Sequence, residues 1–240
     1  MRGATIVSSG LARAVREVCG NTLDFLLPQR CPVCGVPADP RRLFCPTCEC
    51  ALPRIGAAVC ARCLSEGLAP DACARHPGER AYAAFDYDDA IARLVHAMKF
   101  GARPELARAH VAALADALPP RWRRPALVTA VPLHATRRRE RGYDQAAALG
   151  EALADSLGAP FSAALLERVR DTRAQSRLGP RARRANVRGA FRVRHPSWAA
   201  GRRVLVVDDV LTTGATLAEA MSVLRAAGAR TAGAVLAWAQ

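Results

Sequence analysis

Four regularly spaced ligand pairs near the N-terminus restrict the fold of this chain more than any other feature. The pairs are Cys31-x-x-Cys34, Cys45-x-x-Cys48, Cys60-x-x-Cys63 and Cys73-x-x-His76. This spacing is typical of zinc knuckles, in which each pair supplies two ligands and two pairs complete a tetrahedral site. The simplest pairing predicts one site of four thiolates from the first two pairs. It predicts a second site of three thiolates and one imidazole from the last two pairs.

Metal binding is the expected source of stability for this segment. The segment is too short to fold on its apolar residues alone, and structural zinc contributes on the order of 10–16 kcal/mol in zinc-finger peptides. Because each site has four protein ligands and no open position, we expect structural rather than catalytic zinc. His76 is a lone loop histidine, so exposure to solvent is the alternative to metal ligation. Cys19 and Cys50 are left over and are expected to pack against other residues.

A disulfide-rich segment is the alternative interpretation of the nine cysteines. Disulfides persist in oxidising compartments, and residues 1–27 lack the continuous apolar run of a secretory signal. The apolar residues of this segment instead predict a short N-terminal helix. No stretch of the chain approaches the roughly 20 apolar residues of a membrane span. We therefore predict a cytoplasmic protein with reduced, metal-binding thiols.

The composition favours partners that carry negative charge. The formal net charge is +14 and the isoelectric point is near 10.5. Lys99 is the only lysine, so arginine supplies nearly all of the positive charge. Such an excess favours phosphates, pyrophosphates or nucleic acid as ligands. Aromatic residues make up only 5% of the chain, which leaves few rings for stacking on nucleic-acid bases.

The chain after residue 78 has the pattern of an α/β domain. Apolar residues at helical spacing predict helices over 88–100, 106–118, 143–157 and 215–228. Apolar runs predict strands over 126–133, 189–193, 202–209 and 232–239. Strands that alternate with helices indicate a mostly parallel sheet covered on both faces. We expect three segments: a helical segment over 1–27, a zinc-binding module over 28–78 and the α/β domain over 79–240.

Two adjacent carboxylates are placed where such a sheet binds its ligands. Asp208 and Asp209 end a predicted strand, and residues 212–216 (TTGAT) open the next helix. Ligands bind beyond the carboxyl ends of parallel strands. Small residues at a helix N-terminus let backbone N–H groups approach a phosphate, and threonine hydroxyls add further donors. The carboxylates suit the hydroxyls of a sugar, directly or through Mg²⁺, so these residues predict a site for a 5-phosphoribosyl group.

Two other protein classes use similar sequence letters near a strand end. A nucleotide-hydrolysing phosphate loop requires G-x-x-x-x-G-K-[ST], and no lysine follows this loop. A receiver domain also begins with an apolar strand that ends in two aspartates, but too little chain follows residue 209 to build one. Both classes are excluded. Aspartates that only cap a strand and a helix are the remaining alternative.

Four blocks of sequence, in order, resemble the ComF family, also called the GntX type. They are LLPQRCPVCG, VPLHATRRRERGYDQA, DTRAQSRLGPRARRANVRGAF and VLVVDDVLTTGAT. The last block resembles the motif with which type I phosphoribosyltransferases bind phosphoribosyl pyrophosphate (PRPP). The resemblance covers most of the chain and implies an α/β fold with the mostly parallel sheet of type I phosphoribosyltransferases. A small double zinc ribbon would precede this domain.

The resemblance also implies roles for individual residues. Asp208 and Asp209 would hold the ribose and Mg²⁺ and act in catalysis. The 5-phosphate would be bound by Thr212, Thr213, Gly214, Ala215 and Thr216. The pyrophosphate would be bound by Val131, Pro132, Leu133, His134 and Arg137, with Arg138, Arg139 and Arg141 beside them. The span 170–188 would be a cationic loop that closes over bound PRPP, and Lys99 is a further candidate for this site.

Two functions are compatible with these features. The first is a Mg²⁺- and PRPP-dependent phosphoribosyltransferase whose acceptor the sequence leaves open. The second is a non-catalytic PRPP-sensing or scaffold module that binds single-stranded DNA and a helicase partner, because ComF proteins are associated with natural competence and DNA uptake. No covalent nucleophile and no glutamine-hydrolysing domain are evident in the sequence. The positive charge fits both functions, whereas the low aromatic content disfavours a strong base-stacking platform.

Overall fold

The computed structural model describes most of the chain after residue 29. The described residues are 30–39, 41–64, 73, 75–76, 78–100, 105–134, 136, 138–139, 142–170 and 180–240. The predicted helical segment over 1–27 lies outside them, as do Cys19, Arg137 and Arg141. The chain forms two compact units, Met1–Ala51 and Leu52–Gln240.

The first unit is built around its cysteine pairs. Gly35 donates its backbone N–H to the carbonyl of Cys31 at 2.9 Å, which closes the turn of the first pair. Helix α2 (Pro46–Cys50) follows the first cysteine of the second pair, and its Glu49 forms an ion pair with Arg42 at 2.8 Å. Cys50 is exposed, so the expectation that it packs against other residues is wrong. It lies at the end of α2 with its thiol in solvent.

A five-stranded sheet forms the centre of the second unit. Its strand order is β1 (Arg54–Cys60), β2 (Arg80–Asp86), β7 (Arg230–Trp238), β6 (Arg203–Leu211) and β3 (Leu127–Ala130). The last four strands run parallel, and β1 is antiparallel to β2 at one edge. The predicted α/β class with a mostly parallel sheet is confirmed.

Strands β1 and β2 carry the cysteine-rich segment into this sheet. Cys60 is the last residue of β1 and pairs with Arg80, the first residue of β2. The predicted boundary at residue 78 thus lies between β1 and β2, two paired strands of the same sheet. The last two ligand pairs begin at Cys60, the end of β1, and continue into the connection to β2, so they belong to the second compact unit.

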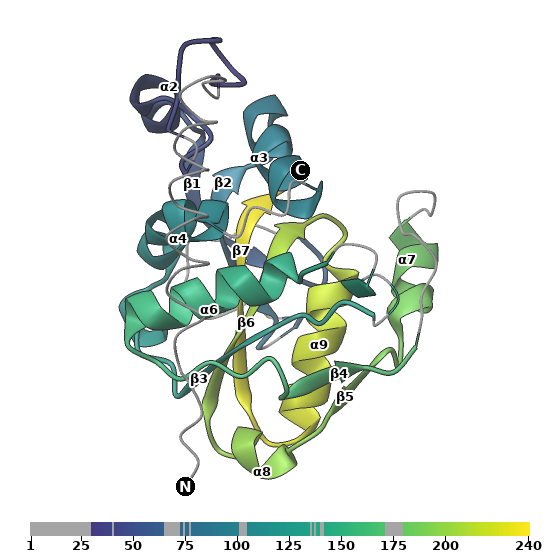
Figure 1. The fold of residues 1–240 in the computed structure, drawn as a ribbon. Helices are drawn as coiled ribbons and strands as arrows, with labels where there is room; N and C mark the ends of the chain where they lie inside the picture. The colour runs from purple at the N-terminus through teal and green to yellow at the C-terminus, as the bar shows by residue number, and fades with distance from the viewer. Residues whose placement is uncertain are drawn as a thin grey trace, which may run out of the picture. The chain divides into compact units, whose positions relative to one another are not determined.

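Four helices of the described part of the second unit were predicted from their apolar spacing. They are α3 (Asp89–Phe100), α4 (Glu105–Ala117), α6 (Gln145–Leu157) and α9 (Ala215–Ala226). Helices α4 and α6 pack on one face of the sheet and α9 packs on the other (Figure 1). The predicted inner face of α9 is confirmed, since Leu217, Ala220, Met221 and Leu224 are buried. In α4, Leu106, His110 and Leu114 are buried, whereas Val111 is half-buried.

The remaining elements are short and lie at the rim of the sheet. They are the 3₁₀ helix η1 (Pro120–Trp122), helix α7 (Pro180–Val187), helix α8 (Pro196–Ala199) and a ribbon of β4 (Leu166–Arg168) with β5 (Phe191–Val193). The span predicted to close over a ligand, 170–188, contains α7, and its residues 171–179 lie outside the description. Among the helices of the described residues, none has the length and apolar character needed to cross a membrane.

Candidate functional site

The first metal cluster combines four cysteines of the first unit. The sulfur atoms of Cys31, Cys34, Cys45 and Cys48 lie within 4.8 Å of one another. Cys34 Sγ and Cys45 Sγ are 3.6 Å apart. A tetrahedral zinc ion with Zn–S bonds of about 2.3 Å places its sulfurs about 3.8 Å apart. The donor set and its spacing therefore fit a structural zinc ion.

The second cluster, which we call the second knuckle pair, consists of Cys60, Cys63, Cys73 and His76. Cys63 Sγ and Cys73 Sγ are 3.5 Å apart. His76 Nδ1 lies 3.5 Å from Cys73 Sγ and 3.7 Å from Cys60 Sγ. His76 thus faces the sulfur atoms rather than standing apart in solvent. The two clusters are consistent with two zinc sites in the predicted pairing.

Crowding of the thiols changes their pKa values. A hydrogen bond that the Cys48 thiol donates to Cys34 raises the pKa of Cys48 to about 12, and burial raises the pKa of Cys60 to about 11. Burial also acts to raise the pKa of Cys31, but hydrogen bonds from the backbone N–H groups of Cys45, Cys34 and Val33 lower it to about 6. Zinc binds thiolates, so metal binding at these clusters releases protons and strengthens as the pH rises.

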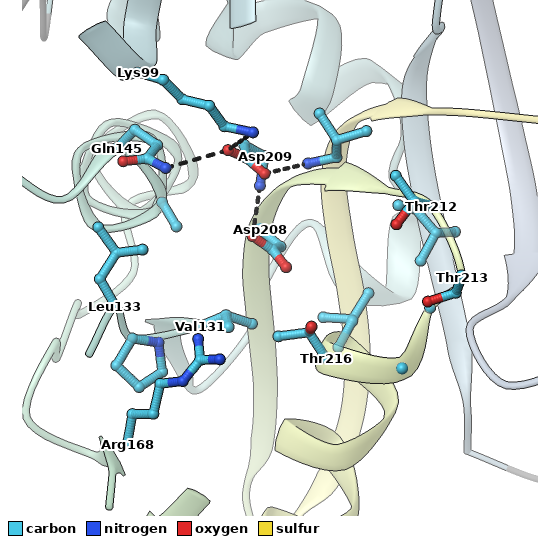
Figure 2. Close-up of a pocket in the computed structure, with 17 residues that line it drawn as sticks. Lys99, Val131, Leu133, Gln145, Arg168, Asp208, Asp209, Thr212, Thr213 and Thr216 are labelled. Carbon is cyan, nitrogen blue, oxygen red and sulfur yellow. Dashed lines mark hydrogen bonds and ion pairs between the residues drawn. The ribbon is translucent and has the colours of Figure 1, made fainter. Parts of the chain in front are cut away.

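A cavity of about 210 Å³ opens at the carboxyl end of β6 (Figure 2). Ten of the residues expected to bind PRPP line it: Val131, Pro132, Leu133, Asp208, Asp209, Thr212, Thr213, Gly214, Ala215 and Thr216. His134 does not line the cavity, and Arg137 lies outside the described residues. The structure therefore brings the two carboxylates, the threonine loop and the turn after β3 together around one space.

Asp209 is held as a buried carboxylate by neighbours from two helices. Its Oδ2 forms an ion pair with Lys99 Nζ at 3.0 Å and accepts a hydrogen bond from Gln145 Nε2 at 3.3 Å. Its Oδ1 accepts from the backbone N–H of Val210 at 2.7 Å. Figure 2 shows these interactions meeting at one carboxyl group. They offset the cost of burying its charge, so Asp209 is a fixed part of the cavity wall.

Asp208 has a different electrostatic environment. Its Oδ1 accepts a hydrogen bond from the backbone N–H of Asp209 at 2.9 Å. Burial and repulsion from the charge of Asp209 raise the pKa of Asp208 from 3.8 to about 8. Between these pH values the unfolded chain loses this proton while the folded chain keeps it, so Asp208 lowers the stability of the ligand-free protein as the pH rises. A bound cation would favour the ionised form and offset this repulsion.

Gly214 shapes the loop between β6 and α9. Its φ of 68° lies in the left-handed region, and it is the N-cap of α9. A Cβ atom at this position would lie 1.7 Å from the carbonyl oxygen of Ala61. Only glycine therefore fits this backbone. The N-cap Gly214 has no side chain that could cap α9, and the N-terminus of a helix favours an anion.

The turn after β3 is anchored by Asp144, the N-cap of α6. Its carboxylate accepts from the backbone N–H of Leu133 at 3.2 Å and from that of Ala147 at 3.1 Å. Arg138 forms an ion pair with the same carboxylate at 3.4 Å. Arg138 thus fixes the turn through Asp144, while Arg139 is exposed.

Two polar cavity residues, Gln145 and Arg168, were not predicted from the sequence. Gln145 follows the N-cap of α6, and Arg168 ends β4 with its guanidinium 5.4 Å from the centre of the Phe191 ring. No local pattern marks either residue, because each reaches the cavity from an element far from residue 208 in sequence. Lys99 was considered as a candidate and does line the cavity.

Two segments of the chain match known protein domains. Residues 22–75 match the double zinc ribbon domain, and residues 144–240 match the phosphoribosyl transferase domain. The DNA utilization protein YhgH of Salmonella typhimurium is 33% identical over 207 residues, which cover 84% of this chain and 86% of that protein. Competence protein F of Haemophilus influenzae is 38% identical over 105 residues, covering 43% of this chain and 46% of that protein.

A shorter match concerns an enzyme. Orotate phosphoribosyltransferase of Xanthomonas euvesicatoria is 53% identical over 38 residues, covering 16% of this chain and 17% of the enzyme. The longer match to YhgH spans most of both proteins, and the two domain matches follow the order of the cysteine clusters and the cavity along the chain. This chain therefore belongs to the ComF family, with a double zinc ribbon followed by a phosphoribosyltransferase domain.

Proposed function

We propose that the cavity at the end of β6 binds PRPP and that the protein transfers the phosphoribosyl group to an acceptor that remains to be identified. One observation carries this proposal. The adjacent carboxylates of Asp208 and Asp209 and the loop over 212–216 line the same cavity, within the part of the chain that matches the phosphoribosyl transferase domain. This is the arrangement needed to hold a sugar with a phosphate at one end.

The 5-phosphate would lie against the loop and the first turn of α9. The loop offers threonine hydroxyls and leads into a 12-residue helix whose N-cap, Gly214, has no side chain. A helix N-terminus favours an anion by about 0.3–1 kcal/mol when exposed and up to about 2 when partly buried. Because Gly214 has no side chain, a phosphate can approach the backbone closely.

The ribose would lie against Asp208, whose carboxyl group borders the cavity, while Asp209 stays bound to Lys99 and Gln145. Carboxylate oxygens are the ligands that Mg²⁺ prefers, so this pair also fits a Mg²⁺ ion that accompanies PRPP. Mg²⁺ would neutralise charge on the pyrophosphate. A cation beside Asp208 would lower the pKa of this residue from about 8 toward its ordinary range.

The pyrophosphate would lie near the turn over 131–133 and the cations at the cavity wall. Arg168 from β4 and Lys99 from α3 both line the cavity (Figure 2). Departure of pyrophosphate leaves positive charge at C1 and O4 of the ribose. Fixed cations stabilise the leaving group, and carboxylates near the ribose favour the charge that develops on the ring. No covalent nucleophile is needed, since the acceptor attacks C1 as the bond to pyrophosphate breaks.

Replacing Asp208 with asparagine tests the ribose site. We expect the affinity for PRPP in the presence of Mg²⁺ to fall at least about tenfold, because one charge-assisted contact to the ribose or the metal is lost. Isothermal titration calorimetry measures this directly. Asp155→Asn, at an exposed position in α6, is the matched control and should leave the affinity unchanged.

The pH dependence gives a second readout of the same site. In the unaltered protein the affinity should rise with pH up to about 8, because Asp208 must lose its proton to bind a cation. Asp208→Asn should lack this rise, which separates the carboxyl group from titration of the phosphates. Equal affinity and equal pH profiles for the two proteins would rule out this ribose site. Release of pyrophosphate in a screen of bases and amines would then identify the acceptor.

Binding of single-stranded DNA is a second candidate function, favoured by an arginine-rich edge. The basic edge consists of Arg124, Arg202, Arg203 and Arg230, all exposed, at the amino ends of β3, β6 and β7. Its members are close, since Arg203 Nη2 donates to the carbonyl of Arg124 at 2.8 Å and Arg230 donates its N–H to the carbonyl of Arg202 at 2.8 Å. The PRPP cavity lies at the opposite ends of these strands.

An exposed aromatic pair adjoins the basic edge. Trp198 in α8 is 44% exposed and stacks on His195 with ring centroids 4.3 Å apart. The backbone N–H of Arg202 bonds to Ala199 at 3.1 Å, which links α8 to the edge (Figure 1). Arginines and a stackable ring are what sequence-independent binding of single strands requires. The similarity to proteins named for DNA utilization and competence also favours such a ligand, and a helicase partner stays a prediction.

A double variant tests the basic edge. Trp198→Ala with Arg202→Ala should weaken binding of an oligothymidine about tenfold and flatten its salt dependence by about one ion. PRPP affinity should not change. The control is Arg54→Ala, an exposed arginine of β1 outside this edge. If the control weakens DNA binding as much as the double variant, the basic edge is not the DNA site.

A further inference from the structure

The second knuckle pair is packed directly against the loop that would hold the 5-phosphate. Ala61 lies between the ligands Cys60 and Cys63 and is fully buried. Its carbonyl oxygen occupies the space where a side chain at position 214 would begin, 1.7 Å from the ideal Cβ position. Ala61 and Arg62 also border a small hollow together with Ala215 and Ala218 of α9. The knuckle therefore forms the back of the loop.

The segment that follows the other two ligands, Cys73 and His76, contacts the opposite end of α9. Arg225, in the last turn of the helix, donates to the carbonyl of Gly78 at 3.0 Å and forms an ion pair with Glu79. Gly78 lies two residues after the ligand His76. Glu79 is buried and also binds Arg62 at 2.8 Å. The helix is thus held at its first turn by one knuckle and at its last turn by the other.

The hydrophobic core joins the same parts. Ala57 and Val59 of β1, with Ala61 just after this strand, belong to one buried cluster with residues of the inner face of α9, including Leu217 and Met221. The backbone N–H of Ala61 bonds to the carbonyl of Glu79 at 2.7 Å, which ties the two knuckles to each other beside the helix. A displacement of either knuckle would therefore move the start of α9.

From these contacts we infer that zinc at the second knuckle pair positions the phosphate loop, so that zinc occupancy there and PRPP binding reinforce each other. We expect no such coupling for the first cluster, whose ligands lie in the Met1–Ala51 unit. The inference rests on the proposed PRPP site. The physical reason for the coupling is direct backbone contact. The four ligands fix the backbone of Ala61, and the backbone of Gly214 packs directly on the Ala61 carbonyl, so a shift of Ala61 moves the loop. Coupling between two binding events is reciprocal, so each must strengthen the other by the same factor.

Two matched variants separate the two clusters. Cys63→Ser removes one ligand of the second knuckle pair, and Cys48→Ser removes one ligand of the first cluster. In the full-length protein, we expect Cys63→Ser to weaken PRPP binding at least about tenfold, within the usual range of coupling between sites. Cys48→Ser should change it less than about twofold. Equal effects of the two substitutions on PRPP affinity would overturn the inference.

The zinc affinity of the Cys48→Ser protein tests the reciprocal effect even where Cys63→Ser fails to fold. This protein keeps the second knuckle pair intact, and its zinc affinity can be measured at equilibrium by competition with a zinc-selective chelator. Saturating PRPP with Mg²⁺ should raise this zinc affinity about tenfold, since the coupling between the two sites is reciprocal. Equal zinc affinities with and without PRPP would contradict the coupling. A purely structural role of zinc predicts no such dependence on PRPP.

Hydrogen exchange keeps this inference distinct from the proposed function. If the unaltered protein does not bind PRPP in calorimetry, the proposed function fails. The contact between Ala61 and the loop over 212–216 can then still be tested by hydrogen exchange in the absence of PRPP. Removing zinc from the Cys48→Ser protein should speed exchange of the amides over 212–218 at least about tenfold, while those of α6 keep their rate. Unchanged exchange over 212–218 would show that the knuckle does not position the loop.

Discussion

Replacing Gly214 with alanine should abolish PRPP binding, with a loss of about a hundredfold or more in affinity. The left-handed backbone at φ 68° disfavours any side chain by about 1 kcal/mol. The larger effect is steric, because the new Cβ atom would overlap the carbonyl oxygen of Ala61 and that backbone cannot move without displacing Cys60 or Cys63. The loop must shift instead, and the N–H groups at the start of α9 then lose their alignment with the phosphate. Calorimetry with PRPP and Mg²⁺ measures the loss.

Gly158 provides a control with the same backbone and no neighbour. It ends α6 at φ 61°, and nothing lies within 4 Å of its Cβ position. Gly158→Ala should cost about 1 kcal/mol of stability and leave PRPP binding unchanged. If Gly214→Ala binds PRPP as well as Gly158→Ala does, the 5-phosphate does not lie in this loop.

Replacing Cys60 with serine should destabilise the whole Leu52–Gln240 unit, by roughly 3–4 kcal/mol, about a quarter of the zinc contribution on the order of 10–16 kcal/mol. From the sequence alone, Cys60→Ser is expected to unfold only the N-terminal region. The structure changes that expectation, because Cys60 is a buried residue of β1 within the central sheet. Loss of this metal ligand should loosen edge strand β1, and the residue that follows this strand, Ala61, contacts the start of α9.

Tryptophan fluorescence during chemical denaturation isolates this effect. The three tryptophans, Trp122, Trp198 and Trp238, all lie in the second unit. Cys60→Ser should therefore move the fluorescence transition to lower denaturant concentration. Cys31→Ser, in the first unit, should leave it in place while halving the bound zinc. A fluorescence transition that does not respond to Cys60→Ser would show that the second unit folds independently of its metal.

The helices could be predicted because their signal is local. Apolar residues at helical spacing follow from which face of a helix is buried, and α3 and α9 bury the residues that this spacing indicates. Strands β1 and β2 carry no such signal. β2 has the sequence RAYAAFD and is buried at six of its seven positions. A strand buried on both faces shows no alternation of apolar and polar residues, and its alanines are only weakly apolar. These strands are defined by their neighbours in the sheet.

The same division holds for the candidate site. One continuous motif contains Asp208, Asp209 and the loop over 212–216. The cysteine pairs are recognisable from their regular spacing. Lys99, Gln145 and Arg168 come from three other elements, and no short motif could place them at the cavity. Their position depends on how α3, α6 and β4 pack around the end of β6.

By itself the sequence determined which residues could form metal clusters, which could hold a phosphorylated sugar, and that helices and strands alternate over 79–240. These are properties of short segments, set by ligand spacing, side-chain chemistry and hydrophobic period. Only the tertiary structure decided that the second knuckle pair belongs to the same sheet as the cavity and that Ala61 packs on Gly214. That contact joins residues about 150 positions apart in sequence, and it exists because the antiparallel edge strand brings one knuckle to the start of α9, which only packing of the whole unit can arrange.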